Sequence, residues 1–317
     1  MRLWVSPMTT NPRVSIVMPV YNGERFIAEA VASALAGTFT DFELLVVDDG
    51  STDASIANAR RAAAGDARLR VLSIPHGGVA AARNAALDAA GGEFIANLDA
   101  DDVMFPDRLQ RQVAFLDAHR DHVAVGVRLV ITDVAGRPMR IQGRAFSHEE
   151  IDEELLAGNG GAISSAGAMF RRAAAREIGG YAPHLRSTGE DHDLWLRLAE
   201  VGRLANLPDV LMRYRVHETN VSVGAGKTEQ RLPVTLDTLT RAFARRGITN
   251  RVAEKRPPRP MKAFERWTDR ALLAHYSGQR PRAVSRALVA IALNPVSPAA
   301  RWALRATLSK SVRITAN

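Results

Sequence analysis

The feature that most constrains the fold is an alternation of buried-strand and amphipathic-helix patterns across the first third of the chain. Apolar, β-branched runs typical of buried strands occur at 14–20, 42–47, 69–74 and 93–98. Segments with helical spacing of apolar residues follow them at 24–35, 51–64, 79–90 and 106–118. This order predicts an α/β fold with a mostly parallel, Rossmann-like sheet and helices on both of its faces.

The charge distribution divides the chain near residue 222. Residues 1–223 contain 23 Lys and Arg against 29 Asp and Glu, whereas 224–317 contain 19 against 5, so the net charges of −6 and +14 give the chain's +8. We therefore expect an N-terminal extension over 1–12, an α/β domain over 13–222 and a basic helical C-terminal region over 223–317. Within that last region, helical patterns occur at 261–276, 280–293 and 298–310.

Composition excludes several classes of protein. The chain has no Cys, so disulfide scaffolds, thiolate metal sites and cysteine nucleophiles are excluded. Its longest uninterrupted apolar run, Ala287–Leu293, is far shorter than the roughly 20 residues of a membrane-spanning helix. The N-terminus lacks the apolar stretch of a secretory signal, so we expect a cytoplasmic protein. Because the basic charge is confined to one end, we do not expect nucleic-acid binding.

Polar side chains follow three of the predicted strands at the point where each strand ends. Tyr21 and Asn22 follow the first strand, Asp48 and Asp49 end the second, and the acidic stretch 99–102 ends the fourth. Ligands of open α/β sheets bind beyond the carboxyl ends of the strands, where these groups should meet. Carboxylates gathered there need an opposite charge, and Mg²⁺ or Mn²⁺ is the natural partner of oxygen ligands. The alternative is that the acids only cap helices.

Six short motifs resemble the inverting glycosyltransferases of family 2. They are Pro19-Val20-Tyr21-Asn22-Gly23, Val47-Asp48-Asp49-Gly50-Ser51, Ala82-Arg83-Asn84, Asp99-Ala100-Asp101-Asp102, Pro106-Asp107-Arg108-Leu109 and Gly189-Glu190-Asp191. Each motif is weak alone, but all six occur in the family's order across residues 13–222. The resemblance implies a GT-A fold, a nucleoside-diphosphate-sugar donor and a divalent metal ion, Mg²⁺ or Mn²⁺.

The resemblance also implies which residues bind the donor nucleotide: Pro19, Tyr21, Asp48, Asp49, Arg83 and Asp99. Tyr21 lies where the family stacks the base. Asp49, with Asp48 beside it, lies where a carboxylate accepts a hydrogen bond from the imide N–H of the base, which suits uracil, thymine or guanine better than cytosine. The donor is therefore expected to be of the UDP, dTDP or GDP type. Arg83 would reach the base or the diphosphate, or would be a solvated helix charge.

The same resemblance implies which residues bind the metal ion and which residue acts as the general base. Asp101, in the D-x-D motif, is the expected metal ligand, with His217 as a second contact to the metal or the phosphates. Asp191 is the expected general base, with Glu190 beside it orienting the acceptor, and Asp193 is the next candidate for the base. As an alternative, acids in the first turn of a helix simply favour its dipole.

We expect transfer of a single sugar to a hydroxyl of a glycan, a lipid-linked acceptor or a surface polysaccharide. The Q-x-x-R-W motif of processive synthases is missing, because Tyr214-Arg215 stands in its place. One rival is a sugar nucleotidyltransferase, although the loop 21–25 lacks the Gly-rich, basic pattern that holds a triphosphate. A non-catalytic sugar-nucleotide-binding protein is the other. The stretch 224–228 resembles the end of a P-loop but lacks the first glycine, since Val221 takes its position.

The basic C-terminal region has three interpretations. It is a solvated helical cap, a cationic face in peripheral contact with anionic membrane lipid, or a docking site for a partner. The lipid interpretation suits a lipid-linked acceptor and the Arg-rich amphipathic helices that carry Trp267 and Trp302.

Overall fold

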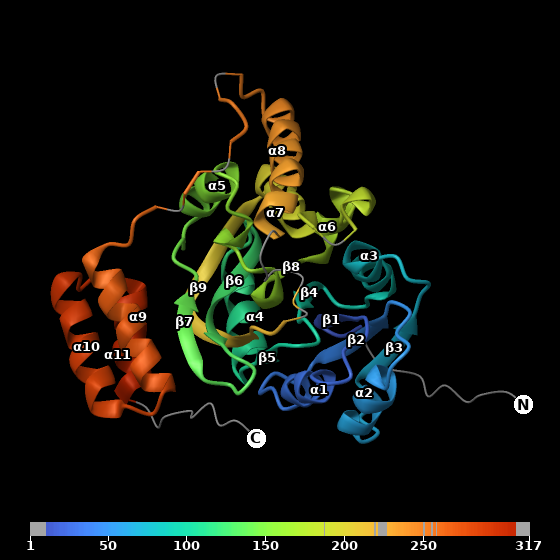
Figure 1. Cartoon of the computed structure of the whole chain (residues 1–317), viewed down its shortest axis with the longest axis horizontal. Helices are drawn as coiled ribbons and strands as arrows, with labels where there is room; N and C mark the ends of the chain where they lie inside the picture. Colours follow the sequence, from blue (N-terminus) through green and yellow to red (C-terminus); the bar gives the residue numbers. More distant parts are fainter. Residues whose placement is uncertain are drawn as a thin grey trace, which may run out of the picture.

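The computed structural model describes residues 11–186, 188–218, 220, 227–249, 251–254, 256–257 and 259–308, with side chains described for all of these except 227–230. Most of the expected extension 1–12 and the P-loop-like stretch 224–228 therefore lie outside the described side chains. Figure 1 shows one mixed sheet at the centre, with helices around it.

The sheet has nine strands, and its first part is parallel as the sequence predicts. Strands lie in the order β3-β2-β1-β4-β8-β6-β9-β5, with β7 paired to β6. The parallel part consists of β1 (Val14–Val20), β2 (Phe42–Asp48), β3 (Leu69–Ser73) and β4 (Phe94–Asn97). The other strands are β5 (Val103–Met104), β6 (His122–Thr132), β7 (Pro138–Gln142), β8 (Met169–Arg171) and β9 (Arg203–Arg215). Strand β8 runs antiparallel to both β4 and β6, whereas β6 and β9 are parallel.

Helices cover both faces because both faces of the central strands are apolar. Ile16 and Met18 belong to one core cluster and Val17, between them, to the other, as the alternation of side chains along a strand requires. The first cluster includes residues of α1 (Ile27–Leu35), α2 (Ser55–Ala63) and α4 (Arg108–Ala118). The second includes residues of α3 (Val79–Ala89), α5 (His148–Leu156), α6 (Arg172–Glu177), α7 (Glu190–Val201) and α8 (Lys227–Arg245).

The order of the strands brings the loops of the candidate site to one edge of the sheet. From β1 the chain winds outward through β2 to β3 and then returns to the other side of β1 as β4. Consecutive connections therefore diverge from β1, which is the arrangement at which α/β sheets bind ligands. The loops after β1, β2 and β4 carry the polar groups that the sequence singles out.

Three further helices form a layer of their own beside β7 and β9 (Figure 1). They are α9 (Ala263–Tyr276), α10 (Arg280–Leu293) and α11 (Pro298–Leu308). Leu272 and Tyr276 of α9 pack with Val130 of β6 and Val210 of β9 in a third core cluster. The expected boundary at 222 falls next to undescribed residues and stays a prediction, although α8 beyond it packs against α7.

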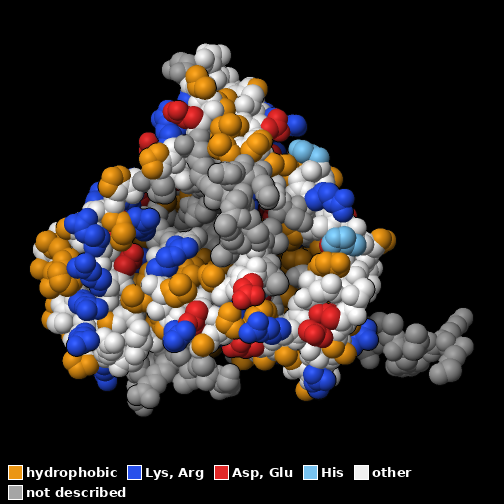
Figure 2. Space-filling model, viewed as in Figure 1, with side chains coloured by type: hydrophobic (Ala, Val, Ile, Leu, Met, Phe, Trp, Pro, Cys, Tyr) orange, Lys and Arg blue, Asp and Glu red, His pale blue; other side chains and the backbone are white. Residues whose placement is uncertain are grey.

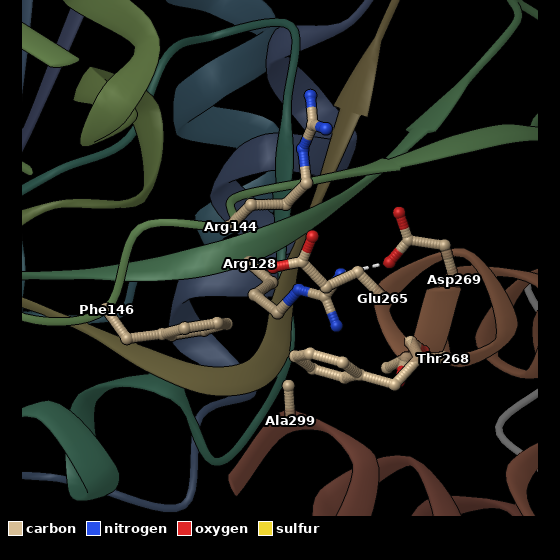
Figure 3. Close-up of a pocket in the computed structure, with 8 residues that line it drawn as sticks. Arg128, Arg144, Phe146, Glu265, Thr268, Asp269 and Ala299 are labelled. Atoms are coloured by element: carbon tan, nitrogen blue, oxygen red, sulfur yellow. Dashed lines mark hydrogen bonds and ion pairs between the residues drawn. The ribbon is translucent and has the colours of Figure 1, made fainter. Parts of the chain in front are cut away.

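The contact between this helical layer and the sheet is closely packed. Figure 3 shows Arg128 of β6 reaching toward α9, where its guanidinium pairs with the carboxylate of Asp269. The cavity beside this pair has a volume of about 10 Å³, space for one water molecule at most. Phe264 and Ala299 close its helical side. The layer is therefore anchored on the sheet through an ion pair that is largely shielded from water.

Most helices and strands lie where the sequence patterns predict them, but some differ in length or were not predicted. Strand β1 has the predicted bounds, and α3 ends one residue before its predicted end. Strand β9 was not predicted: Asn206, Pro208 and Asp209 interrupt its apolar pattern. Helix α8 was not predicted either, and it contains Pro233. Among the described residues, none of the helices has the length and apolarity that a membrane crossing requires.

One buried arginine fixes the end of β4 beneath the acidic loop. Arg108, at the start of α4, is fully buried, and its Nη2 donates to the carbonyl oxygens of Asn97 (2.7 Å) and Ala168 (3.1 Å). Its Nε donates to Oε1 of Gln112 at 3.0 Å. Burial lowers the pKa of Arg108 to about 9, and Asp99 and Asp102 oppose that shift. The motif 106–109 therefore joins β4, α4 and the loop before β8.

We predict that Arg108→Ala lowers the free energy of unfolding by about 3 kcal/mol, because it leaves the Asn97 carbonyl unpaired and a cavity behind. Chemical denaturation measures the change. The matched control is Arg61→Ala on α2, an exposed helical arginine, for which we expect a change below about 0.5 kcal/mol. Equal effects for the two variants would contradict the role given to Arg108.

Candidate functional site

The loop after β2 places a buried carboxylate beside an exposed aromatic platform. Asp49 is buried, and its carboxylate accepts hydrogen bonds from the backbone N–H groups of Gly77 (2.7 Å) and Gly78 (2.9 Å). The Nδ1 atom of His76 lies 3.0 Å from Oδ2 of Asp49. The His76 ring stacks on Tyr21 with the centroids 4.2 Å apart, and Tyr21 is 51% exposed. A carboxylate can accept about four hydrogen bonds, so Asp49 retains capacity for a ligand.

The neighbouring acid, Asp48, closes the turn that carries Asp49. Its Oδ1 accepts a hydrogen bond from the backbone N–H of Ser51 at 2.9 Å, across Gly50, whose φ of +80° favours glycine. Pro19, one strand away, pairs in register with Val47 and is half-buried. The structure thus places Asp48 and Pro19 beside the platform; their contacts to a nucleotide stay a prediction.

Arg83 is a buried bridge and not a solvated helix charge. The Arg83 side chain is 4% exposed, and its guanidinium lies 2.9 Å from Asp99 Oδ1 and 3.0 Å from Glu190 Oε1. It also lies over the ring of Tyr181, 5.5 Å from the centroid. Burial lowers the pKa of Arg83, but Asp99, Tyr181 and Glu190 outweigh it and hold that pKa above its ordinary value. The acidic loop after β4 and the start of α7 are therefore joined by one cation.

The acidic loop has two partly exposed carboxylates and one that is fully buried. Burial raises the pKa of Asp99, and Arg83 opposes that rise. Asp102 is fully buried, and its Oδ1 accepts a hydrogen bond from the backbone N–H of Arg215 at 3.0 Å. Burial raises the pKa of Asp102 well above its usual range, and the charge of Asp101 raises it further. Asp102 thus ties the end of β9 to the loop, whereas Asp99 and Asp101 remain partly exposed.

The two predicted metal residues meet, although 116 positions separate them. Nε2 of His217 lies 2.8 Å from Oδ2 of Asp101. The amide Nδ2 of Asn220 donates to the same oxygen at 3.0 Å, and the ring of Phe26 lies 4.6 Å from that of His217. Asn220 was missed by the sequence analysis; its place three residues after His217 was the only signal.

This donor set fits a divalent cation with a partial protein shell. One carboxylate and one imidazole face each other at Asp101 and His217, both suitable ligands for Mn²⁺. In the described part of the chain, no group of three or more His, Asp or Glu side chains is arranged to hold a metal ion. A cation held by Asp101 and His217 would therefore take its remaining ligands from water and substrate, as Mg²⁺ usually does.

The three acids that open α7 occupy different environments. Glu190 is buried against Arg83, and burial, with the adjacent charge of Asp191, raises the pKa of Glu190 to about 7. Asp193 is buried too, with its Oδ2 2.6 Å from Nη2 of Arg197. Asp191 is half-buried and accepts a hydrogen bond from the backbone N–H of His192 at 2.7 Å. No cationic side chain among the described residues lies within ion-pair distance of Asp191.

These environments distinguish Asp191 from Asp193 as candidates for the general base. The carboxylate of Asp193 is neutralised by Arg197 one turn along the helix, whereas the partner found for Asp191 among the described residues is a backbone N–H. Ser187, three residues before α7, lies outside the described residues. Gly189, with φ of +78°, turns the chain into the helix.

The buried side chain of Tyr181 packs against Arg83, and no sequence pattern indicated this contact. The hydroxyl of Tyr181 accepts a hydrogen bond from Nδ2 of Asn97 at 2.8 Å, and burial raises its pKa to about 12. Asn84, next to Arg83 on α3, bonds both the backbone N–H (2.9 Å) and the carbonyl (2.8 Å) of Tyr181. The asparagine of the motif 82–84 therefore fixes the tyrosine on which the arginine rests.

Comparisons with known proteins agree with this site. The family model described as Glycosyl transferase family 2 matches residues 15–179. The chain is similar to "Putative glycosyltransferase EpsE" of Bacillus subtilis, with 36% identity over 212 residues that cover 66% of this chain and 74% of that protein. It is also similar to the chondroitin synthase of Pasteurella multocida, with 30% identity over 216 residues that cover 67% of this chain but 21% of that protein.

Two solved structures share the fold. S. aureus TarS 1–349 in complex with UDP-GlcNAc gives a TM-score of 0.55 at 18% identity, covering 93% of this chain and 90% of that one. The mannosyltransferase PcManGT from Pyrobaculum calidifontis, in complex with GDP-Man and Mn²⁺, gives 0.54 at 22% identity, covering 92% and 79%. At these identities the likeness is one of fold.

The raised pKa of Glu190 predicts a stability that depends on pH. Between its ordinary pKa of 4.5 and about 7, the unfolded chain has lost the Glu190 proton while the folded chain retains it. The contribution of Glu190 to the free energy of unfolding is therefore greatest below pH 4.5 and decreases as the pH rises to about 7. Denaturant titrations across that range should give a flatter pH dependence for Glu190→Gln than for the native protein.

The control for this titration is Glu177→Gln, which removes an exposed carboxylate at the end of α6 and should leave the slope unchanged. Asp99 and Asp102 keep part of the slope in every variant, because burial raises their pKa values too. Identical slopes for Glu190→Gln and the native protein would contradict the environment described for Glu190.

Proposed function

This chain belongs to glycosyl transferase family 2 and is a glycosyltransferase of the GT-A fold, and from that premise we propose its reaction. It transfers one sugar, with inversion at the anomeric carbon, from a nucleoside diphosphate to a hydroxyl of a glycan or lipid-linked acceptor. The family sets aside the nucleotidyltransferase alternative. A cytoplasmic location and a part in cell-envelope polysaccharide synthesis belong to the same proposal.

One observation carries this proposal: Arg83 joins Asp99 on the nucleotide side to Glu190 on the side of α7. The acids after β4 and the acid Asp191 at the start of α7 thereby share one crevice. An inverting transfer needs a leaving diphosphate on one side of the sugar ring and a base on the other. A crevice with acids on both walls and a buried cation between them is suited to that arrangement.

Asp191 acts as the general base. The acceptor hydroxyl oxygen attacks the anomeric carbon from the face opposite the diphosphate, and its proton passes to the Asp191 carboxylate. The bond from the anomeric carbon to the phosphate oxygen breaks, and its electron pair leaves with the nucleoside diphosphate. Glu190, held by Arg83, fixes the first turn of α7 and so orients the base.

The residues expected to bind the donor suit a nucleobase that carries an imide N–H. Asp49 is a buried carboxylate that accepts hydrogen bonds from Gly77 and Gly78, and Tyr21 with His76 offers a stacked pair of rings beside it. An acceptor in that position favours uracil, thymine or guanine, so the donor is of the UDP, dTDP or GDP type. The TarS and PcManGT complexes with UDP-GlcNAc and GDP-Man are consistent with this range.

The divalent cation of this proposal is Mg²⁺ or Mn²⁺, held by Asp101 and His217. When bound, it would supply positive charge against the negative charge that develops on the leaving diphosphate. Asn220 holds the Asp101 carboxylate in place through its amide, so the ligand geometry does not depend on the cation alone.

The enzyme transfers one sugar to the acceptor hydroxyl and does not extend a polymer processively. The chain lacks the Q-x-x-R-W motif of processive synthases, with Tyr214-Arg215 in that place, and Arg215 instead pairs with Glu29 on α1. The matched stretch covers 21% of the chondroitin synthase, so the remaining activities of that longer protein do not transfer to this chain.

We predict that Asp191→Asn retains donor binding and loses transfer by about 10³-fold or more, because the amide cannot take the acceptor proton. The measurement pairs donor affinity by calorimetry with turnover of a radiolabelled sugar. The matched control is Asp193→Asn, which breaks the pair with Arg197, lowers stability and keeps turnover of the folded fraction. Full turnover in Asp191→Asn, or loss confined to Asp193→Asn, would overturn the assignment.

We also predict that Asp101→Ala removes the dependence of donor binding on Mn²⁺. The substitution removes the carboxylate that contacts His217 and leaves Asp49 with its hydrogen bonds unchanged. Calorimetric titration of the nucleoside diphosphate with Mn²⁺ and with EDTA gives the readout. A native-like difference between the two conditions in Asp101→Ala would place the cation elsewhere.

A further inference from the structure

Helix α10 exposes large apolar side chains on its outer face. Leu288 is 52% exposed, Leu293 51%, and Val296, in the turn that follows, 70%. Val289 is exposed beside them. These four residues lie on α10 and in the turn after it, at the edge of the molecule, where α10 packs against α9 and α11 (Figure 1).

Helix α10 buries small alanine side chains and exposes large leucine side chains. Its buried residues are Ala283, Ala287 and Ala290, which recur at helical spacing and face the neighbouring helices. Leu288 and Leu293 are exposed, whereas Val284 and Ile291 are half-buried. A helix stabilised by core packing alone would place its large apolar side chains inward, so the outer leucines need another explanation.

Arg280, Arg282 and Arg301, on α10 and α11, have no acidic partner among the described residues. Residues 277–317 contain no Asp or Glu. The guanidinium of Arg280 donates to the carbonyl of Leu308 (2.9 Å), that of Arg301 to the carbonyl of Pro295 (2.7 Å), and that of Arg282 to Oε1 of Gln279 (3.3 Å). These acceptors are neutral, so the positive charge is not compensated. Figure 2 shows basic side chains running down the edge of the molecule where α10 lies, with apolar side chains beside them.

We propose that this lipid-facing surface, made of Leu288, Val289, Leu293 and Val296 with Arg280, Arg282 and Arg301, rests on a membrane that contains anionic phospholipid. Exposed leucines bordered by arginines are what a helix lying in the membrane interface presents, with its apolar side chains among the acyl chains and its guanidinium groups at the phosphates. A nucleic acid would use the arginines but not the leucines. The proposal is independent of the sugar and nucleotide that the enzyme uses.

The test is co-sedimentation of the full-length protein with vesicles. We expect binding to vesicles of phosphatidylcholine mixed with phosphatidylglycerol, little binding to pure phosphatidylcholine, and release as the salt concentration rises. The variant Arg280→Gln/Arg282→Gln/Arg301→Gln should lower the partition coefficient about tenfold or more. Leu288→Gln/Leu293→Gln should lower it as well, because the apolar contact is lost.

Matched variants control for net charge and exposed apolar area. Arg60→Gln/Arg61→Gln/Arg120→Gln removes the same three charges from exposed positions far from α10 in the sequence. Met139→Gln/Leu232→Gln removes two exposed apolar side chains from β7 and α8. Both controls should bind vesicles like the native protein. The shift of melting temperature with the nucleoside diphosphate should be native-like in all four variants, which separates this test from that of the reaction.

Three outcomes would overturn the proposal. They are equal binding to both kinds of vesicle, equal loss in the control variants, and no binding at low salt. If the protein ignores vesicles but forms an oligomer by light scattering that Leu288→Gln/Leu293→Gln dissociates, the surface is a protein contact and not a lipid contact.

Discussion

The structure of the site depends on one buried cation, the guanidinium of Arg83. It lies between Asp99 and Glu190 at 2.9 and 3.0 Å, and so joins the loop after β4 to the first turn of α7. Asp99, Asp101 and Asp102 would repel Glu190 and Asp191 across the crevice without it. Tyr181, fixed by Asn84 and Asn97, holds the arginine from below. The arginine thus allows acids from two distant parts of the chain to lie close together.

A second constraint, the order of the strands, decides which acids meet. Because β2 and β4 flank β1, the loops that carry Asp49 and Asp99 open on the same edge. The rest of the sheet, where β8 runs antiparallel to β4 and β6, lies on the other side. There the backbone N–H of Arg215, at the end of β9, donates to Asp102, and His217, two residues further on, contacts Asp101. The parallel strands β1 to β4 therefore carry Asp49 and Asp99, and the segment after β9 brings His217 back to the acidic loop.

The parallel half and the acids at its strand ends could be predicted from the sequence, because each strand there is an uninterrupted apolar run. Strand β9 could not, since Asn206 and Asp209 break its pattern and are tolerated only through tertiary contacts: Asn206 donates to the carbonyls of Ala145 and Ala162, and Asp209 pairs with Arg111. The residues expected at the site come together, but their mutual contacts could not be foreseen. Helical spacing placed Arg83 on α3 without saying that it is buried, and no pattern linked it to Tyr181 or Glu190.

The central claim is that the edge above β1, β2 and β4 binds a nucleoside diphosphate with a divalent cation. A thermal-shift panel of UDP, dTDP, GDP and CDP, each with Mn²⁺ and with EDTA, tests it most directly, because a ligand that binds the folded state raises the melting temperature. The account predicts a shift with at least one of UDP, dTDP and GDP, no shift with CDP, and loss of the shift in EDTA. A folded protein that responds to none of the four nucleotides, or to CDP alone, would contradict it.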